Sequence, residues 1–528
     1  MGRFVNPDNV AFSSAVKSEI YVDKTGLIDY TNRILGTTQA FICNSRPRRF
    51  GKSMTANMLS AYYSKGCDSH VLFDGLKISG FDSYDKNLNK YDVIHIDVQA
   101  FLSELGGEID RLVSYISSSI VKELIEYYPN VIDGSSCSLF NAIASIYNKK
   151  GVRFIFIIDE WDVILRDDNQ NKKIQDEYIL FLRGLFKGTE PSRYILLAYL
   201  TGILPIKKEK TQSAMNNFRE YSMLNGGPFS EYVGFTEIEV MELAKKYNRD
   251  FNAIKEWYDG YLINGYSIYN PNSVVNSILD DARISYWSST ALYDAITPLI
   301  DLNFDGLKSS ILDLLAGNEV RVDVGHYNTD TPFKNKDDVL TYLIYLGYLS
   351  YNQQKLTVFI PNEEVRQELF RATSESKWND FFELEKESEK ILFATVEKDS
   401  CTVKKGIEKI HSEYSSIITY NNENSLSCIL TISYLASLKY YYKPIREFPT
   451  GKGYADFVYL PRAEYRDEYP SLVIELKWNT LSSIAIDQIK EKKYPNSLLS
   501  YSGAILLVAI SYDKKNKEHS VLIEEFEK

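Results

Sequence analysis

The sequence is poor in the residues that build zinc sites and disulfide frameworks. Its 528 residues include only five cysteines and five histidines. The cysteines are scattered, none forms a CxxC pair, and the histidines do not cluster near them. A structural zinc site or a disulfide framework is therefore not expected. Any bound metal is expected to be a hard cation held by carboxylates.

Long apolar runs are also missing. No stretch reaches the roughly 18 uninterrupted apolar residues of a membrane span, and the longest runs, at 154–158 and 194–204, have the length of buried strands. The first residues, MGRFVN, lack an apolar signal region, and Asn6 does not fit the myristoylation pattern. We therefore expect a cytoplasmic protein that does not contact a membrane.

The sequence has no excess of positive charge, since its formal net charge is −11. Proteins that coat nucleic acid are usually basic, so this charge counts against tight non-specific binding of DNA or RNA. It does not exclude a nuclease, because bound metal ions can neutralise a local acidic site.

The chain is long enough for roughly two to four domains. Residues 1–230 alternate apolar runs with helical stretches, which predicts a parallel α/β sheet. The runs lack clean alternation, as expected for strands covered on both faces, and lie at 40–44, 93–97, 154–159 and 194–200. Residues 231–395 predict a mostly helical connector with a strand at 355–360.

Residues 396–528 predict a separate domain with the order α-β-β-β-α-β. The first predicted helix is followed by three strands, a second helix and a last strand. These elements are expected at 425–438, 440–448, 454–460, 472–478, 482–493 and 504–510.

The segment RPRRFGKS at 46–53 follows a predicted buried strand and opens a helix, the placement of a P-loop. In such a loop, backbone N–H groups face the phosphates of a nucleotide, the lysine neutralises them and the serine hydroxyl binds Mg²⁺. Gly51, Lys52 and Ser53 would have these roles here. The first glycine of the general motif is replaced by Arg46, so this tripeptide alone is a weak signal.

The predicted strand at 154–159 ends in two acids, Asp159 and Glu160. Asp159 would hold Mg²⁺ through water, and Glu160 would polarise the attacking water. The alternative is a core strand that ends in a solvated acidic turn. Together with Gly51-Lys52-Ser53 about a hundred residues upstream, the pair favours an ATPase.

These segments resemble an AAA-ATPase-like family that is found in bacteria fused to a PD-(D/E)XK nuclease. The resemblance rests on YVDKT at 21–25, RPRRFGKS at 46–53, DEWD at 159–162, LTGI at 200–203, YVGFT at 232–236 and WYDGY at 257–261. The family has RPRRFGKS in place of a glycine-first P-loop, so Arg46 fits it. Trp161 departs from the family's usual tyrosine.

The resemblance implies ATP and Mg²⁺ as cofactors, and it places Thr201 at a sensor position beside the γ-phosphate. A turn residue before Gly202 is the alternative for Thr201. For Arg48 and Arg49, three interpretations are left open. They contact phosphate, they contact another subunit of a homo-oligomer, or they lie in a solvated basic loop.

In the C-terminal segment, three charged residues are predicted to share one face of a sheet. Glu475 and Lys477 are two positions apart on a predicted strand, so they point to the same side. A polar hairpin loop places Asp456, on the preceding strand, beside them. The acids would hold Mg²⁺ or Mn²⁺, which polarises a phosphodiester, and Lys477 would stabilise the developing charge. The alternative is a solvated strand face.

This arrangement is similar to the PD-(D/E)XK nucleases, which have a restriction-endonuclease-like fold. The resemblance adds Glu423, at the start of the preceding helix, as a metal ligand, and Gln488 on the following helix. The alternative for Glu423 is a carboxylate that only interacts favourably with the positive end of the helix dipole. The alternative for Gln488 is an exposed helix residue.

The two segments together predict an ATP-hydrolysing protein with a metal-dependent nuclease domain, acting on DNA rather than RNA in defence or nucleic-acid processing. One rival is a nucleotide-switched interaction protein whose nuclease-like domain binds a partner without cutting it. Another is an ATPase that does not act on nucleic acid.

Overall fold

The computed structural model describes most of the chain. The described residues are 2–106, 108–132, 137–167, 172–206, 215–287, 293–302, 304–325, 327, 333–374, 379–414, 423–442, 444–449, 454–479, 482–491 and 503–526. The chain divides into two compact units, of which the first is Met1–Tyr286 with Arg321–Asn362 and the second is Trp287–Val320 with Glu363–Lys528. The domain boundaries expected after 230 and after 395 stay predictions.

The first unit contains a five-stranded parallel sheet in the order β2-β3-β4-β1-β5. The strands are β1 (Phe41–Ser45), β2 (Asp92–Asp97), β3 (Phe154–Asp159), β4 (Ile195–Gly202) and β5 (Arg219–Tyr221). The four strands predicted from apolar runs are confirmed. The edge strand β5 is absent from the prediction because its sequence, Arg-Glu-Tyr, contains no apolar run. Both β1 and β3 are buried along their whole length, as expected for a sheet covered on two faces.

The strand order brings the two predicted nucleotide-binding segments together. Because β4 lies between β1 and β3, their carboxyl ends share one edge of the sheet. Thr201 of β4 pairs with Asn44 of β1 on one side and with Asp159 of β3 on the other. The P-loop after β1 and the acids at the end of β3 are therefore neighbours in space.

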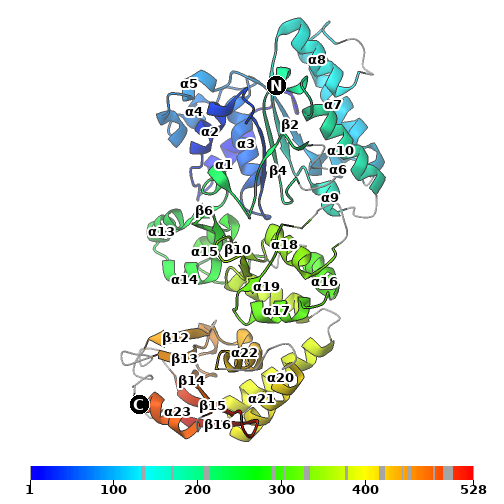
Figure 1. Cartoon of the computed structure of the whole chain (residues 1–528). Helices are drawn as coiled ribbons and strands as arrows, with labels where there is room; N and C mark the ends of the chain where they lie inside the picture. The colour runs from blue at the N-terminus through cyan, green and yellow to red at the C-terminus, as the bar shows by residue number, and fades with distance from the viewer. Residues whose placement is uncertain are drawn as a thin grey trace. The chain divides into compact units, whose positions relative to one another are not determined.

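Helices cover both sides of this sheet, with α1 to α5 on one side and α6, α7, α8 and α10 on the other (Figure 1). The helices are α1 (Val10–Val16), α2 (Gly26–Ile34), α3 (Lys52–Tyr63), α4 (His70–Phe73), α5 (Tyr84–Asn87), α6 (Val98–Glu104), α7 (Leu112–Tyr127), α8 (Leu139–Lys150), α9 (Val163–Asp167), α10 (Lys172–Phe186) and α11 (Pro191–Tyr194). Helix α3 contacts β2, β3 and β4, which fixes its first turn at the sheet edge described above.

The rest of the first unit combines short strands with helices. The helices are α13 (Glu237–Lys246), α14 (Phe251–Tyr258), α15 (Pro271–Asp280) and α18 (Lys336–Leu346). Two three-stranded sheets have the orders β6-β8-β7 and β10-β11-β9, and β9 begins at Val320, one residue before the first unit resumes. Their strands are β6 (Phe235–Thr236), β7 (Tyr261–Ile263), β8 (Tyr266–Tyr269), β9 (Val320–Arg321), β10 (Ser350–Asn352) and β11 (Thr357–Phe359). Strands this short are too brief to show an alternation of apolar and polar residues. The sequence therefore predicts only the strand at β11.

The second unit is built around a mixed five-stranded sheet in the order β12-β13-β14-β15-β16. The strands are β12 (Ile445–Pro449), β13 (Tyr454–Tyr459), β14 (Ser471–Trp478), β15 (Ile505–Asp513) and β16 (Glu518–Glu525). Only β14 and β15 are parallel, and the other pairs are antiparallel. The predicted order α-β-β-β-α-β is confirmed, and β16 adds a strand after it.

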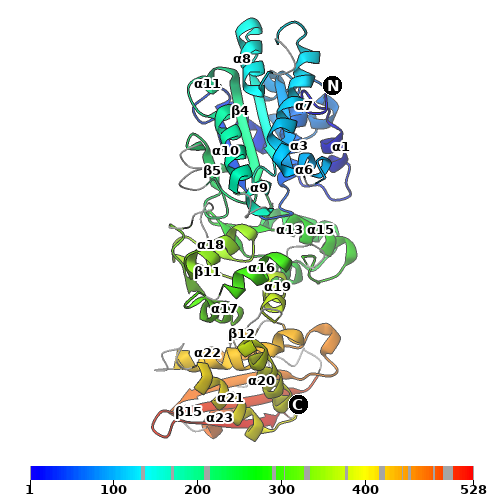
Figure 2. The same ribbon diagram turned by 90° about the vertical axis from the view of Figure 1, so that its right-hand side faces the viewer.

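The helices of the second unit are α16 (Tyr293–Asp301), α17 (Leu307–Leu315), α19 (Glu363–Ser374), α20 (Asn379–Val396), α21 (Ser400–Tyr414), α22 (Glu423–Ser433) and α23 (Ser482–Glu491). Helix α22 contacts β14, α21 contacts β16, and α23 contacts β14 and β15. Figure 2 labels these three helices and β15. The first six residues of β14 are all buried, so both faces of this strand are covered.

Some predicted bounds in this unit are wrong. The predicted helix at 425–438 ends at Ser433 and is followed by a 3₁₀ helix at Leu435–Lys439, and the strand predicted from 440 begins at Ile445. The run of tyrosines looks like a strand, but the amides of Tyr440 and Tyr441 bond back to the carbonyl of Ser437. The predicted helix end at 492–493 lies outside the described residues. No helix in the described part of the chain is long and apolar enough to cross a membrane.

Candidate functional sites

The P-loop turn positions Lys52 at the start of α3. Gly51, the residue before the helix, has φ +91°, a conformation that glycine adopts without steric strain. The Lys52 side chain is only 4% exposed. Its Nζ donates a hydrogen bond to the Pro47 carbonyl at 3.1 Å and lies 3.8 Å from Glu160 Oε1. The lysine thus turns back over the loop toward the acids at the end of β3.

Burial controls the charges at this edge of the sheet. Burial lowers the pKa of Lys52, while the carboxylates of Glu160 and Asp159 oppose that shift. Burial likewise raises the pKa of Asp159 to about 6, and a hydrogen bond from Ser53 acts against it. Ser53 and Asp159, the predicted Mg²⁺ ligands, therefore lie near each other. A hydroxyl and a desolvated carboxylate side by side form a donor set that suits a hard cation.

Glu160 is held by an arginine that the sequence patterns do not single out. Arg166 Nη2 lies 2.5 Å from Glu160 Oε2, and Arg166 Nε lies 3.0 Å from Asp162 Oδ2. The Arg166 side chain is 6% exposed and that of Asp162 is fully buried. The available signal is the four-residue spacing of Asp162 and Arg166, which places them on one face of a helical turn.

Asp162 also ties the end of β3 to the end of β4. Its Oδ2 accepts hydrogen bonds from the amides of Ile203 at 3.1 Å and Leu204 at 2.7 Å. A Cβ at Gly202 would lie 2.2 Å from Asp162 Oδ1 and 2.8 Å from Trp161 Cδ1. This close approach explains the glycine after Thr201.

Thr201 is fully buried, and its Oγ1 donates a hydrogen bond to the Asn44 carbonyl at 3.0 Å. Its hydroxyl thus connects β4 to the strand that leads into the P-loop. Thr201 lies in register with Asp159, as a sensor position requires, and that role stays a prediction.

The arginines of RPRRFGKS have separate roles in the loop. Arg46 is fully buried, and its guanidinium donates hydrogen bonds to the carbonyls of Ser45 at 2.9 Å and Phe229 at 3.3 Å. This buried contact to the loop after β5 shows why a large side chain fits where the general motif has glycine. Arg49 has φ +67°, and its Nη1 donates to the Tyr286 carbonyl at 2.7 Å. Arg48 is half-buried.

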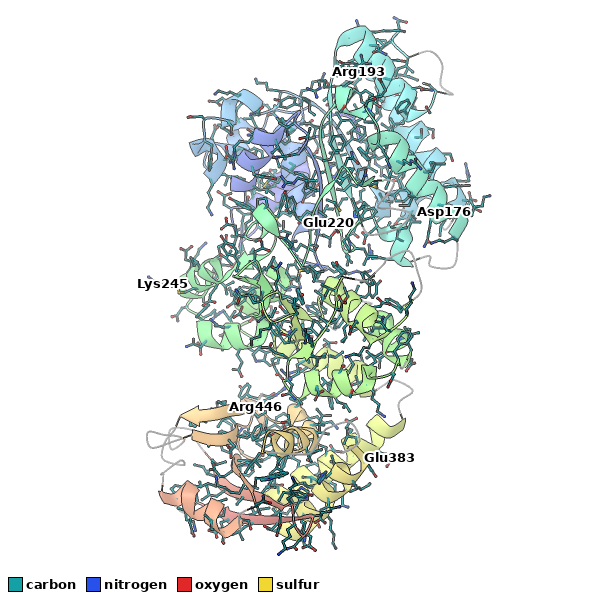
Figure 3. The ribbon with its side chains drawn as sticks, viewed as in Figure 1. Asp176, Arg193, Glu220, Lys245, Glu383 and Arg446 are labelled. Atoms are coloured by element: carbon teal, nitrogen blue, oxygen red, sulfur yellow. The ribbon has the colours of Figure 1, made fainter. Side chains whose placement is uncertain are left out.

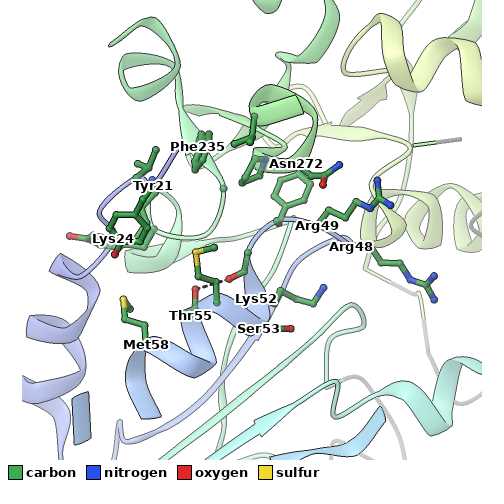
Figure 4. Close-up of a pocket in the computed structure, with 18 of the residues that line it drawn as sticks. Tyr21, Lys24, Arg48, Arg49, Lys52, Ser53, Thr55, Met58, Phe235 and Asn272 are labelled. Atoms are coloured by element: carbon green, nitrogen blue, oxygen red, sulfur yellow. Dashed lines mark hydrogen bonds between the residues drawn. The ribbon is translucent and has the colours of Figure 1, made fainter. Parts of the chain in front are cut away.

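The P-loop residues from Arg48 to Ser53, together with Glu160 and Arg166, line a cavity of about 700 Å³ in the first unit. Lys52, Ser53, Glu160 and Arg166 form its polar end. Its apolar walls come from the N-terminal segment, α3 and the region around β6, with Phe12, Ile20, Tyr21, Met58 and Phe235 among the lining residues. In Figure 4, Lys52 and Ser53 point to one side of the P-loop turn, whereas Tyr21 and Met58 lie on the other side. The volume lies within the usual range for small-molecule sites.

The second candidate site lies on β13 and β14 of the second unit. Glu475 is 2% exposed, and its Oε1 accepts a hydrogen bond from Lys477 Nζ at 2.9 Å, so the two side chains share a face of β14 as predicted. Phe457 pairs with Ile474 across the strands. Asp456 Oδ2 accepts a hydrogen bond from the Leu476 amide at 2.7 Å. The structure therefore brings Asp456, Glu475 and Lys477 together.

The two helix residues of this predicted site are placed only by their backbone. Glu423 is the first residue of α22, and Gln488 lies on α23. Their side chains are outside what the structure describes. Among the described side chains, no three His, Cys, Asp or Glu residues cluster closely enough to hold a metal. Two carboxylates on adjacent strands still suit Mg²⁺, which keeps several of its own waters in most protein sites.

Two similar proteins give a limited comparison. An uncharacterized protein in the vnfD 5′ region of Azotobacter chroococcum mcd 1 is 27% identical over 292 residues, which are 53% of this chain and 52% of that protein. The chain thus spans about half the length of this curated relative. The structure of the Aeropyrum pernix ORC2 protein, solved as ADPNP and ADP complexes, covers 68% of this chain and 96% of its own at 11% identity, with a TM-score of 0.29. That score is too low to establish a shared fold.

Family models match both candidate sites. A model described as a predicted AAA-ATPase matches residues 12–211, which include the P-loop, the acids of β3 and Thr201. A model of the PD-(D/E)XK nuclease superfamily matches residues 421–521, which include Asp456, Glu475 and Lys477. The chain therefore combines an N-terminal AAA-ATPase-like domain with a C-terminal domain of the PD-(D/E)XK nuclease superfamily.

Proposed function

We propose that this protein binds and hydrolyses ATP in its first unit and cuts a phosphodiester backbone, with the help of Mg²⁺, in its second. The observation that carries the ATPase part is that Lys52, Ser53 and Glu160 line the 700 Å³ cavity together, with Asp159 beside Lys52. The lysine supplies a desolvated positive charge for phosphate oxygens, and such charge-assisted contacts are strong where water is excluded.

The cavity also has room for the nucleoside. Its apolar walls, which include Phe12, Tyr21 and Phe235, offer surfaces on which a purine can stack. With the phosphates at Lys52 and Ser53, Glu160 would orient a water for attack on the terminal phosphate. Arg49 and Thr201 complete the proposed nucleotide contacts. A bound Mg²⁺ would be held by Ser53 and Asp159 and would neutralise charge on the phosphates.

For the nuclease part, the supporting observation is the set of Asp456, Glu475 and Lys477 on neighbouring strands. Asp456 and Glu475, with Glu423 as a further ligand, would hold Mg²⁺ or Mn²⁺, whose role is to polarise the phosphodiester and activate water. Lys477 can stabilise the charge that develops on the phosphate. DNA rather than RNA as the substrate, a role in defence or processing, a homo-oligomeric state and a cytoplasmic location are parts of this proposal that rest on the sequence alone.

The second candidate function is a nucleotide-switched protein whose nuclease-like domain binds a partner without cutting it. The ion pair between Lys477 Nζ and Glu475 Oε1 at 2.9 Å, which engages an oxygen of a proposed metal ligand, favours it. Metal-dependent cleavage of plasmid DNA, single-stranded DNA and RNA separates the two functions. We expect cleavage of DNA that requires Mg²⁺ or Mn²⁺ and is lost in Glu475→Gln. No cleavage of any substrate by the folded protein would favour the binding function.

ATP binding is tested separately with Lys52→Ala. This change removes the buried charge that faces the phosphates, so ATP affinity should fall sharply while the circular dichroism spectrum stays that of the parent. Lys65→Ala is a matched control, because Lys65 pairs with Asp92 and is not among the residues that line this cavity. Unchanged ATP affinity in a folded Lys52→Ala protein would contradict the P-loop assignment.

A further inference from the structure

The second unit contains a cavity of about 200 Å³ that shares no residue with the Asp456, Glu475 and Lys477 set. Two arginines line it, Arg366 of α19 and Arg446 of β12, together with Tyr459 at the end of β13. Figure 3 labels Arg446 in the second unit. Tyr459 follows Asp456 by three positions on the same strand, so the alternation of side chains directs the two to opposite faces of the sheet. The volume is below the roughly 300–1,000 Å³ of sites for drug-sized ligands. The occupant must therefore be small.

The cavity has an excess of positive charge. Arg446 donates hydrogen bonds to Thr431 Oγ1 at 3.0 Å and to the Ala316 carbonyl at 3.3 Å, both uncharged acceptors. Arg366 lies 3.7 Å from Glu363 Oε2, but this one carboxylate also pairs with Arg462 at 2.8 Å. The described residues that line the cavity include no carboxylate. Burial lowers the pKa of Arg366, the carboxylate of Glu363 opposes this shift, and the neighbouring Arg446 adds to it.

A hydroxyl without a partner lies in the same wall. The Tyr459 side chain is 1% exposed, and its hydroxyl makes no hydrogen bond to any described residue. Burying a hydroxyl in this state is unfavourable, and most buried hydroxyls in proteins are bonded. The ring of the neighbouring Tyr434 has its centroid 5.7 Å from that of Tyr459. Unlike Tyr459, Tyr434 has a hydrogen-bonded hydroxyl, whose partner is Thr395 Oγ1 at 2.7 Å. An acceptor inside the cavity would satisfy Tyr459.

We propose that this cavity binds a single phosphate group, held by the guanidinium groups of Arg366 and Arg446 and by the hydroxyl of Tyr459. A phosphate has acceptor oxygens to match these donors, and the planar fork of arginine suits its geometry. Thr431 supports the site by accepting from Arg446 while its own hydroxyl donates to the Ser427 carbonyl. The phosphate is either free inorganic phosphate or the terminal group of a mononucleotide.

The test is calorimetric titration of the full chain with inorganic phosphate and, separately, with AMP, in the presence of EDTA. Lys52→Ala serves as the parent protein, so that the P-loop does not contribute. We expect binding of phosphate, and Tyr459→Phe should weaken it by roughly tenfold or more, since a hydrogen bond to a charged group is lost. Tighter binding of AMP than of phosphate would identify a terminal phosphate as the ligand, and the reverse would identify the free ion.

Two further variants make the result specific. Tyr459→Phe should not destabilise the free protein, because its hydroxyl has no partner to lose. Tyr434→Phe, the matched control, should lower stability through loss of its bond to Thr395 and leave phosphate affinity unchanged. Arg446→Gln should weaken phosphate binding at least as much as Tyr459→Phe. The proposal is overturned if the parent binds neither ligand, or if both Tyr459→Phe and Arg446→Gln bind them as well as the parent.

Discussion

Arg166 Nη2 lies 2.5 Å from Oε2 of Glu160, the residue proposed to polarise water for ATP hydrolysis. The other carboxylate oxygen of Glu160 lies 3.8 Å from Lys52 Nζ. The acid is thus held between two cations, on a backbone with φ +50°, an unusual value for a residue other than glycine. Such local strain is common at functional sites.

Glu160→Gln is expected to separate nucleotide binding from hydrolysis. The amide keeps an oxygen that can accept from Arg166, so the site should stay folded and bind ATP with affinity near that of the parent. An amide cannot act as a base, and loss of general-base catalysis lowers rates by about 10²–10⁴-fold. Phosphate release measured beside ATP binding checks both parts. Hydrolysis at the parental rate would show that another residue activates the water.

Lys477→Ala is expected to abolish cleavage while metal binding is kept. A protonated ammonium has no lone pair, so Lys477 cannot be a metal ligand. Removing it takes a cation 2.9 Å from Glu475 Oε1 out of the site, and Mn²⁺ should bind as well as in the parent or more tightly. Asp456→Ala should instead lose both cleavage and Mn²⁺ binding. Calorimetric titration with Mn²⁺ beside a cleavage assay distinguishes these cases, and normal cutting by Lys477→Ala would refute the lysine's role.

Gly202→Ala is expected to destabilise the first unit. The new Cβ would lie 2.2 Å from Asp162 Oδ1, and Asp162 cannot move freely because it bonds the amides of Ile203 and Leu204. Overpacking of this kind lowers the free energy of unfolding by about 1–3 kcal/mol. Gly184→Ala is the control: no atom lies within 4 Å of its new Cβ in helix α10, so stability should rise by about 0.5–1 kcal/mol. Urea unfolding of both variants measures the difference. Equal stabilities would mean that the contact between β3 and β4 is loose.

His519 should make the second unit less stable in acid. It is 1% exposed in β16 and packs against Tyr512 and His411, and burial lowers its pKa to about 3, with further contributions from His411 and Lys404. Between pH 3 and the unfolded value near 6.5, the unfolded chain binds a proton that the folded chain does not. Stability should therefore rise with pH in this window, by up to about 1.4 kcal/mol per pH unit for one proton, and be lost as the pH falls toward 3.

The measurement is urea unfolding between pH 4 and pH 7, with the His519 ring followed by NMR. His519→Gln should flatten the pH dependence of the free energy of unfolding. His70→Gln, a change at a half-exposed histidine of α4 in the first unit, should leave it as in the parent. A His519 ring that titrates near pH 6.5 would contradict the predicted acid sensitivity.

The sequence by itself determined the local elements of both domains. Apolar runs predict β1 to β4, because a strand buried on both faces must be apolar along its length. Spacing predicts that Glu475 and Lys477 share a face, because side chains alternate along a strand. Gly51-Lys52-Ser53 and Asp159-Glu160 were identifiable as sites since each needs only one strand end and the residues after it. Short strands such as β5 to β8 were not identifiable, because two to four residues carry no period.

Only the tertiary structure decided which distant residues meet. The order β3-β4-β1 places Thr201 between Asn44 and Asp159, and no local pattern encodes strand order. The ion pair between Glu160 and Arg166 depends on the turn after β3. The burial of Arg46 depends on its hydrogen bond to the carbonyl of Phe229, which is 183 residues away in the chain. The hydroxyl of Tyr459 is left without a partner by the packing of α19, α22 and β12 around one cavity. Burial sets the pKa of Asp159 and His519, and burial is a property of the packed fold rather than of the neighbouring residues in the chain.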